Sequence, residues 1–559
     1  MRNKKLLILL SLLVILTIAG FFRLWQLDSI PPGLYPDEAI NGNEALDSLE
    51  TGNFKVFYSE NNGREGLFIW LIALSFSIFG PSIWALKIVP AIFGILTVLG
   101  IYLLTKKILP NTKYKLQATK IALLSSFFLA ISFWHINFSR IGFRAILVPF
   151  ALVFAFYFLF RGFRTTLLRP TGYGGRGKIY NFIISGIFFA FGFYTYISYR
   201  FVIFILATAL LCWWFVYKKR NLQKKFLLFV TYCLTTTLIV ALPIGIYFLT
   251  NPQDFFGRAS GVSVFSQPNP IYEIGKSLII NLQMLNFYGD GNWRHNFAGS
   301  PMLLWPIGIF FLIGIILSIK KAVVSTKNKN YPLLTTHYIL LGWFLFMLMP
   351  GILSFEGIPH ALRVIGVIPV VYIFAALGGF WLFEKLKNFY KTRNQKIIFG
   401  VIIIILLFTV TYAQFDKYFY QWAKKPGVRG AFSENYVKIG NYLNSLPEDT
   451  QKYVIVNQSG VPVPFPDGIP MPAQTVIFIE KINLILRSQD YPPTTYLLPE
   501  DLNQIKMEKN LVIVPLQYDE NLFVQLSIFF LDGEIKEEKG VWIYQINNKV
   551  YQINNKCGS

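Results

Sequence analysis

Long apolar runs separated by short polar segments fill the chain from its amino terminus to about residue 415. A membrane-spanning helix needs about 20 mostly apolar residues. By this measure the sequence predicts about eleven spans. They lie near residues 6–22, 85–105, 117–133, 146–160, 181–197, 201–217, 226–249, 302–319, 336–354, 362–383 and 397–413. The shorter run Leu67–Phe79 is typical of an interfacial helix.

Basic residues in the polar segments predict the orientation of these spans. Lys and Arg gather between the apolar runs in five clusters, at Lys106–Lys120, Arg161–Lys178, Lys218–Lys225, Lys320–Lys329 and Lys385–Lys396. Loops that stay in the cytoplasm carry such an excess of Lys and Arg. With the amino terminus inside, an odd number of spans puts every cluster on the cytoplasmic side. The sequence thus predicts a multi-pass protein of the cell membrane whose carboxy-terminal segment is extracytoplasmic.

Composition supports the same class of protein. Apolar residues make up 54% of the 559 residues and charged residues only 14%, whereas soluble domains carry about 25% charged residues. The formal net charge of +23 comes largely from the cytoplasmic clusters, so it does not indicate a nucleic-acid groove.

A second domain is predicted after the last span. Residues 1–415 form the membrane domain, and residues 416–559 are rich in proline and carry mixed charge without another span. Apolar strands at Tyr453–Asn457, Leu511–Pro515 and Val541–Ile546 alternate with helical patterns at Glu434–Leu446 and Asn521–Phe530. The predicted fold class is therefore a mainly α polytopic membrane protein with a soluble carboxy-terminal α/β domain.

Adjacent carboxylates stand out in the first long external loop, where Asp37 and Glu38 follow Pro36. A like-charged neighbour can raise one carboxyl pKa toward the range of a general base. Pro-Asp-Glu is equally typical of the first turn of a helix. The residue types alone leave both interpretations open.

The same loop resembles a known enzyme family. An Asp-Glu pair soon after the first span, then basic Arg64 entering the helix Leu67–Phe79, is similar to membrane glycosyltransferases that use lipid-linked sugars. These family 39-like enzymes include the protein O-mannosyltransferases and the lipid A aminoarabinose transferases. The resemblance implies the membrane-embedded C-type fold and Asp37 as the base toward the acceptor. The family has Pro-Pro after the basic residue, where this chain has Glu65-Gly66.

Three more segments resemble the bacterial branch of this family: Phe138–Arg144, Tyr288–Asn296 and Ser354–Arg363. Each places arginine at the predicted external mouth of the spans, and two also place histidine there. Fixed cations stabilise the charge that develops on a departing phosphate. We expect the donor phosphate to be bound by Arg64, Arg294, His360 and Arg363, with additional candidates Arg140, Arg144, Arg258, Asp290 and His295.

Each of these arginines has a plainer interpretation, as an interfacial side chain or the partner of an acid such as Glu356. A metal site built from the external histidines with Asp37, Glu38 or Asp290 is conceivable. No close histidine spacing supports it, and we expect no cofactor and no metal.

The predicted function is a glycosyltransferase, hexosyl or pentosyl. It moves a sugar with inversion from a polyprenyl phosphate to an acceptor hydroxyl of a protein, lipid or wall glycan at the outer face. Asp37 would accept the hydroxyl proton and Glu38 would orient the acceptor or balance an arginine. The alternatives are a transporter or flippase of lipid-linked saccharides, which calls for charged residues at mid-membrane, and a non-catalytic cell-envelope binding protein.

Overall fold

The computed structural model describes residues 2–109, 115–168, 175–328, 331–463, 468–487, 494–507 and 510–546. The chain forms two compact units. Unit 1 consists of Met1–Leu27, Glu65–Phe68 and Pro90–Trp422. Unit 2 consists of Asp28–Arg64, Ile69–Val89 and Ala423–Ser559. Most of the long loop after the first predicted span therefore belongs to the same compact unit as the carboxy-terminal segment.

The helices confirm the predicted fold class. Within the described residues, nine helices are long and apolar enough to cross a membrane, and each coincides with a predicted span. The predicted spans near 117–133 and 181–197 coincide with the shorter apolar helices Gln117–Ala130 and Ile179–Phe193. The helices at the eleven predicted spans are α1 (Arg2–Leu24), α4 (Ile83–Ile108), α5 (Lys115–Ala130), α7 (Leu147–Leu168), α8 (Gly175–Phe193), α9 (Val202–Lys218), α10 (Gln223–Thr250), α13 (Trp305–Lys327), α14 (Tyr331–Ile352), α15 (Ile368–Lys387) and α16 (Arg393–Phe415).

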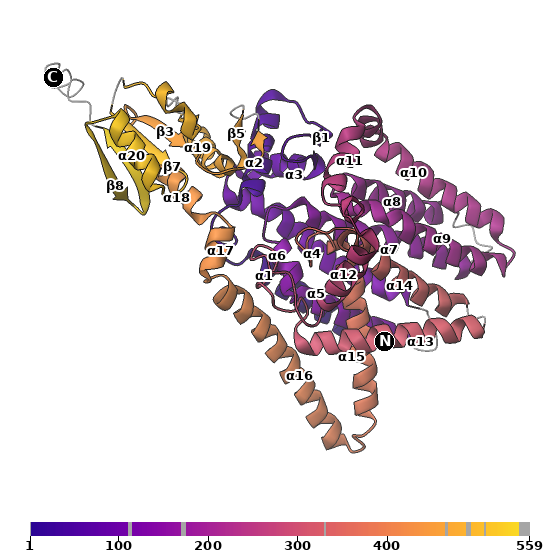
Figure 1. Cartoon of the computed structure of the whole chain (residues 1–559). Helices are drawn as coiled ribbons and strands as arrows, with labels where there is room; N and C mark the ends of the chain where they lie inside the picture. The colour runs from indigo at the N-terminus through magenta and orange to yellow at the C-terminus, as the bar shows by residue number, and fades with distance from the viewer. Residues whose placement is uncertain are drawn as a thin grey trace. The chain divides into compact units, whose positions relative to one another are not determined.

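The helical bundle of unit 1 has a buried centre and an apolar surface. The span Ile365–Lys387, which contains α15, is 83% buried, whereas the spans containing α10 and α16 are 22% and 17% buried. Their exposed Leu and Ile side chains suit a lipid surround. Helix α8 packs against α7 and α10, and α15 packs against α13 (Figure 1). A Cβ atom on Gly314 of α13 would overlap the carbonyl oxygen of Phe374, so glycine permits this close approach.

Hydrogen bonds join several short helices and loops of unit 1. The short helices are α6 (Phe133–Phe138), α11 (Pro252–Gly261) and α12 (Pro270–Gln283). The loop after α12 returns on itself, because Met302 N donates to Met284 O at 3.1 Å. The segment around Ser354 pairs with Ser263, and Ser277 Oγ of α12 donates to Gly351 O at 2.9 Å. These bonds fix the loops that carry Asp290 and Arg363.

Unit 2 contains the predicted α/β domain. Its sheet has the order β6-β3-β7-β9-β8, in which β6, β3 and β7 are parallel and β9 and β8 antiparallel. The strands are β3 (Gln451–Ile455), β6 (Thr495–Leu497), β7 (Leu511–Pro515), β8 (Gly533–Glu538) and β9 (Val541–Ile546). The helices are α17 (Pro426–Ala431), α18 (Glu434–Leu443), α19 (Gln474–Arg487) and α20 (Glu520–Phe529). The predicted strands and helices of this domain are confirmed, with boundaries shifted by a few residues.

Two apolar layers hold this sheet. Alternate strand residues such as Val454 and Val512 pack with Tyr442 of α18 and Val476 of α19 on one face. Residues of the opposite register pack with α20 on the other face. This two-sided burial follows from the near-continuous apolar sequence of β3 and β7.

The first long loop packs on this domain within unit 2. It contains α2 (Pro36–Thr51), the two-residue strands β1 (Phe57–Tyr58) and β2 (Arg64–Glu65), and α3 (Leu67–Phe79). Helix α2 lies against α19: Asn43 Nδ2 donates to Gln474 Oε1 at 2.8 Å, and Gly42 leaves room for the ring of Phe478. Asp37 is therefore carried by a helix that is anchored to the carboxy-terminal domain. The short strands β4 (Pro462–Val463) and β5 (Ile469–Pro470) complete the unit.

Candidate active site

The carboxylates of the first loop have different environments. Both lie in the first turn of α2, which begins at Pro36. Glu38 is fully buried, and its Oε1 accepts a hydrogen bond from Tyr35 N at 3.3 Å. Asp37 is half-buried. Glu38 thus caps the helix, which is the structural interpretation that the sequence left open, while Asp37 keeps an accessible carboxylate.

Asp37 is oriented by the loop that follows β1. Asn61 Nδ2 donates to Asp37 Oδ1 at 3.0 Å. Asn61, Asn62 and Gly63 have φ values of 50°, 62° and 81°, a left-handed stretch that Asn and Gly adopt most readily. The sequence Asn-Asn-Gly therefore builds the turn that brings the amide to Asp37.

Arg64 follows this turn and forms an ion pair inside unit 2. Its Nη2 lies 2.5 Å from Glu44 Oε1, and its Nη1 donates to Asn41 Oδ1 at 3.0 Å. Arg64 is 1% exposed. Burial raises the pKa of Glu44, and the Arg64 charge opposes that shift. The structure thus places Arg64 beside an acid, so its predicted phosphate-binding role would need that pair to open.

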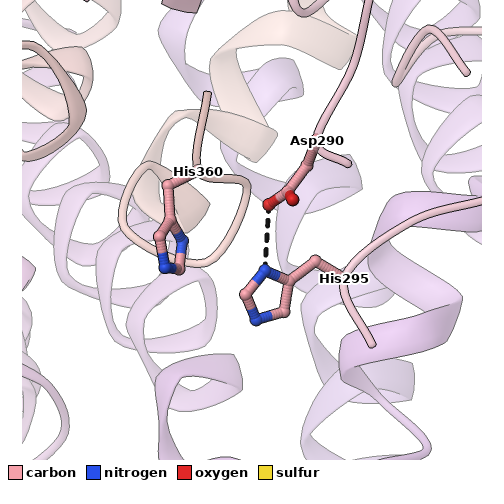
Figure 2. Close-up of side chains that lie close together, drawn as sticks. All are labelled: Asp290, His295 and His360. Atoms are coloured by element: carbon pink, nitrogen blue, oxygen red, sulfur yellow. Dashed lines mark hydrogen bonds and ion pairs between the residues drawn. The ribbon is translucent and has the colours of Figure 1, made fainter. Parts of the chain in front are cut away.

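A second polar group lies in unit 1, where Asp290 and His295 from the loop after α12 meet His360 (Figure 2). His295 Nδ1 is 2.9 Å from Asp290 Oδ2, and the two imidazole rings lie 4.7 Å apart between centroids. Because an ionised carboxylate only accepts, His295 donates from Nδ1. Asp290 therefore fixes the orientation of His295.

Backbone contacts make this group rigid. Asp290 Oδ2 also accepts from Ala361 N at 2.8 Å, which joins the Asp290 loop to the segment that carries His360. Asp290 Oδ1 accepts from Asn292 N at 2.8 Å. Trp422 Nε1 donates to Asn296 O at 3.2 Å. A buried carboxylate with these partners is held in place rather than free to move.

The Asp290 group opens into a polar cavity of about 380 Å³. His360, Glu356 and Arg363 line it together with Asp290 and His295. Arg363 is half-buried, and its Nη1 donates to Glu356 O at 2.5 Å. Arg363 also lines a second cavity of about 220 Å³. The walls of the second cavity are mainly apolar and include Tyr196, Ile197, Phe201, Val262, Phe265, Pro350 and Leu353.

Arg294 stands next to the polar cavity in the chain. It is half-buried, and both its N and its Nε donate to Asn292 Oδ1, at 2.9 Å and 3.4 Å. Its carbonyl accepts from Asn137 Nδ2 at 2.6 Å. The guanidinium thus contacts the turn that also carries Asp290.

The remaining arginine candidates have other surroundings. Arg140 is fully buried and donates to three carbonyl oxygens, those of Phe22, Trp25 and Gln26. Arg144 Nε lies 2.7 Å from Glu65 Oε2. Arg258 belongs to α11, but its side chain lies outside the described part of the chain.

The Asp290 group has the residue types of a metal site. One ligand atom from each of Asp290, His295 and His360 can be chosen so that all three lie within 4.8 Å of one another, and zinc is bound by such ligands at about 2 Å. In the structure Asp290 Oδ2 already accepts two hydrogen bonds. A metal ion would have to replace the one from His295.

Comparison with known proteins shows a likeness of fold. ArnT from Cupriavidus metallidurans bound to undecaprenyl phosphate aligns with a TM-score of 0.53 and 12% identity, over 98% of this chain and 98% of that chain. Its apo form gives 0.52 and 11%, over 97% and 98%. In fold, the chain is similar to ArnT. The C-type membrane fold that the sequence resemblance implies is thereby confirmed.

Two further comparisons agree with this likeness. Residues 67–247 match the family model of dolichyl-phosphate-mannose-protein mannosyltransferase. The Archaeoglobus fulgidus oligosaccharyltransferase tethered with an acceptor peptide has a TM-score of 0.50 and 14% identity, over 85% of this chain. This chain spans 63% of the length of that enzyme. No curated protein matches the sequence.

The family match begins at Leu67, the first residue of the helix that suggested the resemblance. It includes Arg140 and Arg144 but leaves out Asp37, Asp290 and Arg363. The family match therefore says nothing about the roles of these three residues, which rest on the contacts and cavities described above. Sequence reasoning missed Asn41, Glu44 and Asn61 as partners of the first-loop residues. The spacing of Asp37, Asn41 and Glu44 along one helix face was the available signal.

Proposed function

We propose that this protein is a membrane glycosyltransferase whose donor is a sugar carried by a polyprenyl phosphate. The observation that carries the proposal is the position of Arg363, which lines both the apolar cavity and the polar cavity. A polyprenyl phosphate is apolar along its chain and anionic at its head. A cation at the junction of an apolar and a polar cavity matches that ligand.

The polar cavity supplies the charge that the reaction requires. When the sugar leaves, the polyprenyl phosphate gains negative charge, and nearby cations stabilise the transition state. Arg363 and His360 line the cavity, and His295 is oriented there by Asp290. We assign donor phosphate binding to Arg363 and His360, with Arg294 as a further contributor.

Asp37 is the proposed base. It would take the proton from the acceptor hydroxyl while that oxygen forms a bond to the anomeric carbon. The bond from the anomeric carbon to the phosphate oxygen breaks, and polyprenyl phosphate leaves with the electron pair. One attack in line with the leaving group inverts the anomeric centre. The half-buried carboxylate and its hydrogen bond from Asn61 support this role.

No metal ion is required in this proposal. Arg363 supplies a fixed positive charge toward the phosphate, and His360 and His295 line the same cavity as candidate hydrogen-bond donors. The Asp290 carboxylate is already engaged by Ala361 N, Asn292 N and His295. Should a divalent ion bind there, Asp290, His295 and His360 would hold it, and it would supply Lewis-acid stabilisation of the phosphate.

We place the reaction at the outer face of the cell membrane. In the described residues, the nine long helices and two of the three shorter apolar helices, Gln117–Ala130 and Ile179–Phe193, correspond to the eleven predicted spans. The third, Leu67–Phe79, is the helix that the sequence assigned to the interface. With the basic clusters inside, the loops that carry Asp37, Asp290 and Arg363 lie outside. A reporter active only outside the cell, fused after Asn330, should stay silent, and activity there would contradict this orientation.

The proposal is tested with purified protein in nanodiscs and radiolabelled polyprenyl-phosphate hexoses and pentoses. Native membrane extract supplies protein, lipid and glycan acceptors. Wild type should release polyprenyl phosphate, and Asp37→Asn should lower that rate by about 100-fold or more, as expected for loss of a general base. Asp47→Asn on the same helix is the matched control and should keep full activity.

Each alternative outcome has a defined meaning. If Asp37→Asn still transfers sugar, the protein is a glycosyltransferase but Asp37 is not its base. The flippase alternative is tested with the same protein in sealed proteoliposomes. Donor that crosses their membrane intact, without release of polyprenyl phosphate, would replace the proposal with a flippase.

A further inference from the structure

A third cavity lies in unit 2, at one end of the central sheet. Its volume is about 330 Å³. Segments distant in sequence line it: α18 with Asn435, the loop after β7 with Gln517 and Tyr518, and the start of β9 with Trp542. None of the residues that line it is charged. The reaction proposed above uses none of them.

The topology of the sheet opens a crevice between β3 and β7, next to this cavity, whose lining comes from α18, the end of β7 and the start of β9. From β3 the chain crosses to β6 on one side, whereas from β7 it continues to β8 and β9 on the other side. Connections that leave two neighbouring parallel strands in opposite directions open a crevice outside their carboxyl ends. The cavity lies at the carboxyl end of β7, because Pro515 is both the last residue of that strand and part of the lining.

The loops around the cavity are fixed before any ligand arrives. Asn457 Nδ2 donates to Gln517 O at 2.9 Å, and Gln517 N donates to Asn457 Oδ1 at 3.0 Å. Asn435 Nδ2 donates to Leu516 O at 3.4 Å. On the other side, Lys539 and Gly540 have φ values of 51° and 76°. This pattern of two left-handed residues forms the tight hairpin turn before β9.

Two aromatic rings stand exposed on this rigid frame. Tyr518 is 57% exposed and Trp542 is 38% exposed. Their ring centroids lie 5.0 Å apart at an interplanar angle of 60°. Trp542 occupies the exposed position of β9. An aromatic pair exposed beside a preformed cavity offers an apolar surface on which a ligand can pack.

We propose that this cavity binds a neutral saccharide. The C–H faces of a pyranose ring pack on aromatic rings, and its hydroxyl groups pair with side-chain amides, which both donate and accept. Trp542 and Tyr518 would provide the rings, and Asn435 and Gln517 the amides. The lack of a charged lining residue argues against a phosphate or a carboxylate as the recognised group.

This site is independent of the proposed transfer reaction. It would hold a sugar that is already part of a glycan, by binding alone and with no bond made or broken. Its test is therefore a binding measurement, and its failure would leave the transferase proposal untouched.

The experiment is saturation-transfer difference NMR on the full-length protein in nanodiscs. The probes are methyl β-glucopyranoside, cellotetraose, chitotetraose, mannotetraose and, as a charged probe, UMP. Wild type should transfer saturation to at least one neutral saccharide. Trp542→Ala and Tyr518→Ala should each weaken that binding by about tenfold, the loss expected for one aromatic contact. Trp542→Phe should retain most of it.

Phe529→Ala is the matched control, because Phe529 is an exposed ring on α20 of the same unit that does not line the cavity. It should bind like wild type. If Trp542→Ala fails to fold, Gln517→Ala replaces it and should also weaken binding. The proposal is overturned if no neutral saccharide binds to wild type, if the cavity variants bind as wild type does, or if UMP is the probe that depends on Trp542.

Discussion

Arg140 and Arg363 lie in similar places in the sequence, each a few residues before a buried membrane helix, yet the fold uses them differently. Arg140 is fully buried and donates to the carbonyls of Phe22, Trp25 and Gln26. Arg363 is half-buried and lines two cavities. The first guanidinium is enclosed by backbone, and the second faces space that a ligand can fill.

The difference separates structural charges from functional ones. A buried charge is stable only when hydrogen bonds from the protein replace water, and Arg140 meets that requirement with carbonyl oxygens near the end of α1. Arg64, paired with Glu44, belongs with Arg140. Asp37 and Arg363 keep accessible atoms, so they belong to the group that can act on a ligand. The predictions below test this division.

The largest expected effect is on folding, from Arg140→Ala. It would remove the buried guanidinium and its hydrogen bonds to the carbonyl oxygens of Phe22, Trp25 and Gln26, and the loss of each is expected to cost about 1 kcal/mol or more. We expect little folded protein after detergent extraction, measured by size-exclusion chromatography. Arg363→Ala should give a normal yield. Normal folding of Arg140→Ala would show that its hydrogen bonds are not structural.

The second prediction concerns the Arg64–Glu44 pair. Arg64→Met leaves Glu44 buried and unpaired, which should lower the unfolding free energy by about 3–5 kcal/mol. The double variant Arg64→Met/Glu44→Met should recover most of that loss in thermal unfolding. If the double variant is stable and still transfers sugar, Arg64 does not bind the donor phosphate. A stable but inactive double variant would return Arg64 to the phosphate-binding group.

The sequence predicts those elements of the fold that depend on a local pattern of residues. The spans and strands β3, β7 and β9 follow from runs of apolar residues, because such runs favour burial whatever the rest of the fold is. The surroundings of Arg140 and Arg363 depend on distant segments, since Arg140 meets residues near position 22 and Asp290 meets Ala361. Asn43 and Gln474 are 431 residues apart, and no local pattern predicts that contact.

A smaller effect is expected at Asp290, which orients His295. In Asp290→Asn, the side-chain amide can donate to His295 Nδ1. It would then favour the tautomer that carries its proton on Nε2 rather than on Nδ1. Because the role is to position another residue, we expect transfer by the folded variant to fall about 10- to 100-fold. The melting temperature should fall as well, because the amide NH2 replaces the oxygen that accepts from Ala361 N or from Asn292 N. Wild-type transfer should persist in excess EDTA. Loss of transfer in EDTA that added Zn²⁺ restores would instead assign Asp290, His295 and His360 to a metal ion.

The smallest effect concerns a buried acid in the carboxy-terminal domain. Burial raises the pKa of Glu480 above its ordinary value of 4.5, although Thr494 and Tyr496 donate hydrogen bonds to it. The folded state therefore binds the proton more tightly than the unfolded state. This contribution to stability is complete below pH 4.5 and is lost as the pH rises through the folded pKa.

Glu480→Gln should therefore flatten the pH dependence of unfolding, by about 1.4 kcal/mol for each unit of pKa difference. Thermal unfolding of both proteins from about pH 4 to about pH 8 checks this, because that range begins near the ordinary pKa of 4.5 and extends above it. Sugar transfer should not change, since Glu480 is a structural charge. An equal pH dependence in both proteins would contradict the raised pKa.

The measurement that tests the central claim most directly is lipid binding to Arg363→Gln. Native mass spectrometry of wild type and variant, with undecaprenyl phosphate and with undecaprenol, separates the phosphate from the chain. Wild type should prefer the phosphate lipid, and Arg363→Gln should lose about tenfold or more of that affinity, as for a charged hydrogen bond, while binding undecaprenol as before. Arg429→Gln, at an exposed arginine, is the control. Equal affinity of wild type and Arg363→Gln for undecaprenyl phosphate would contradict the account.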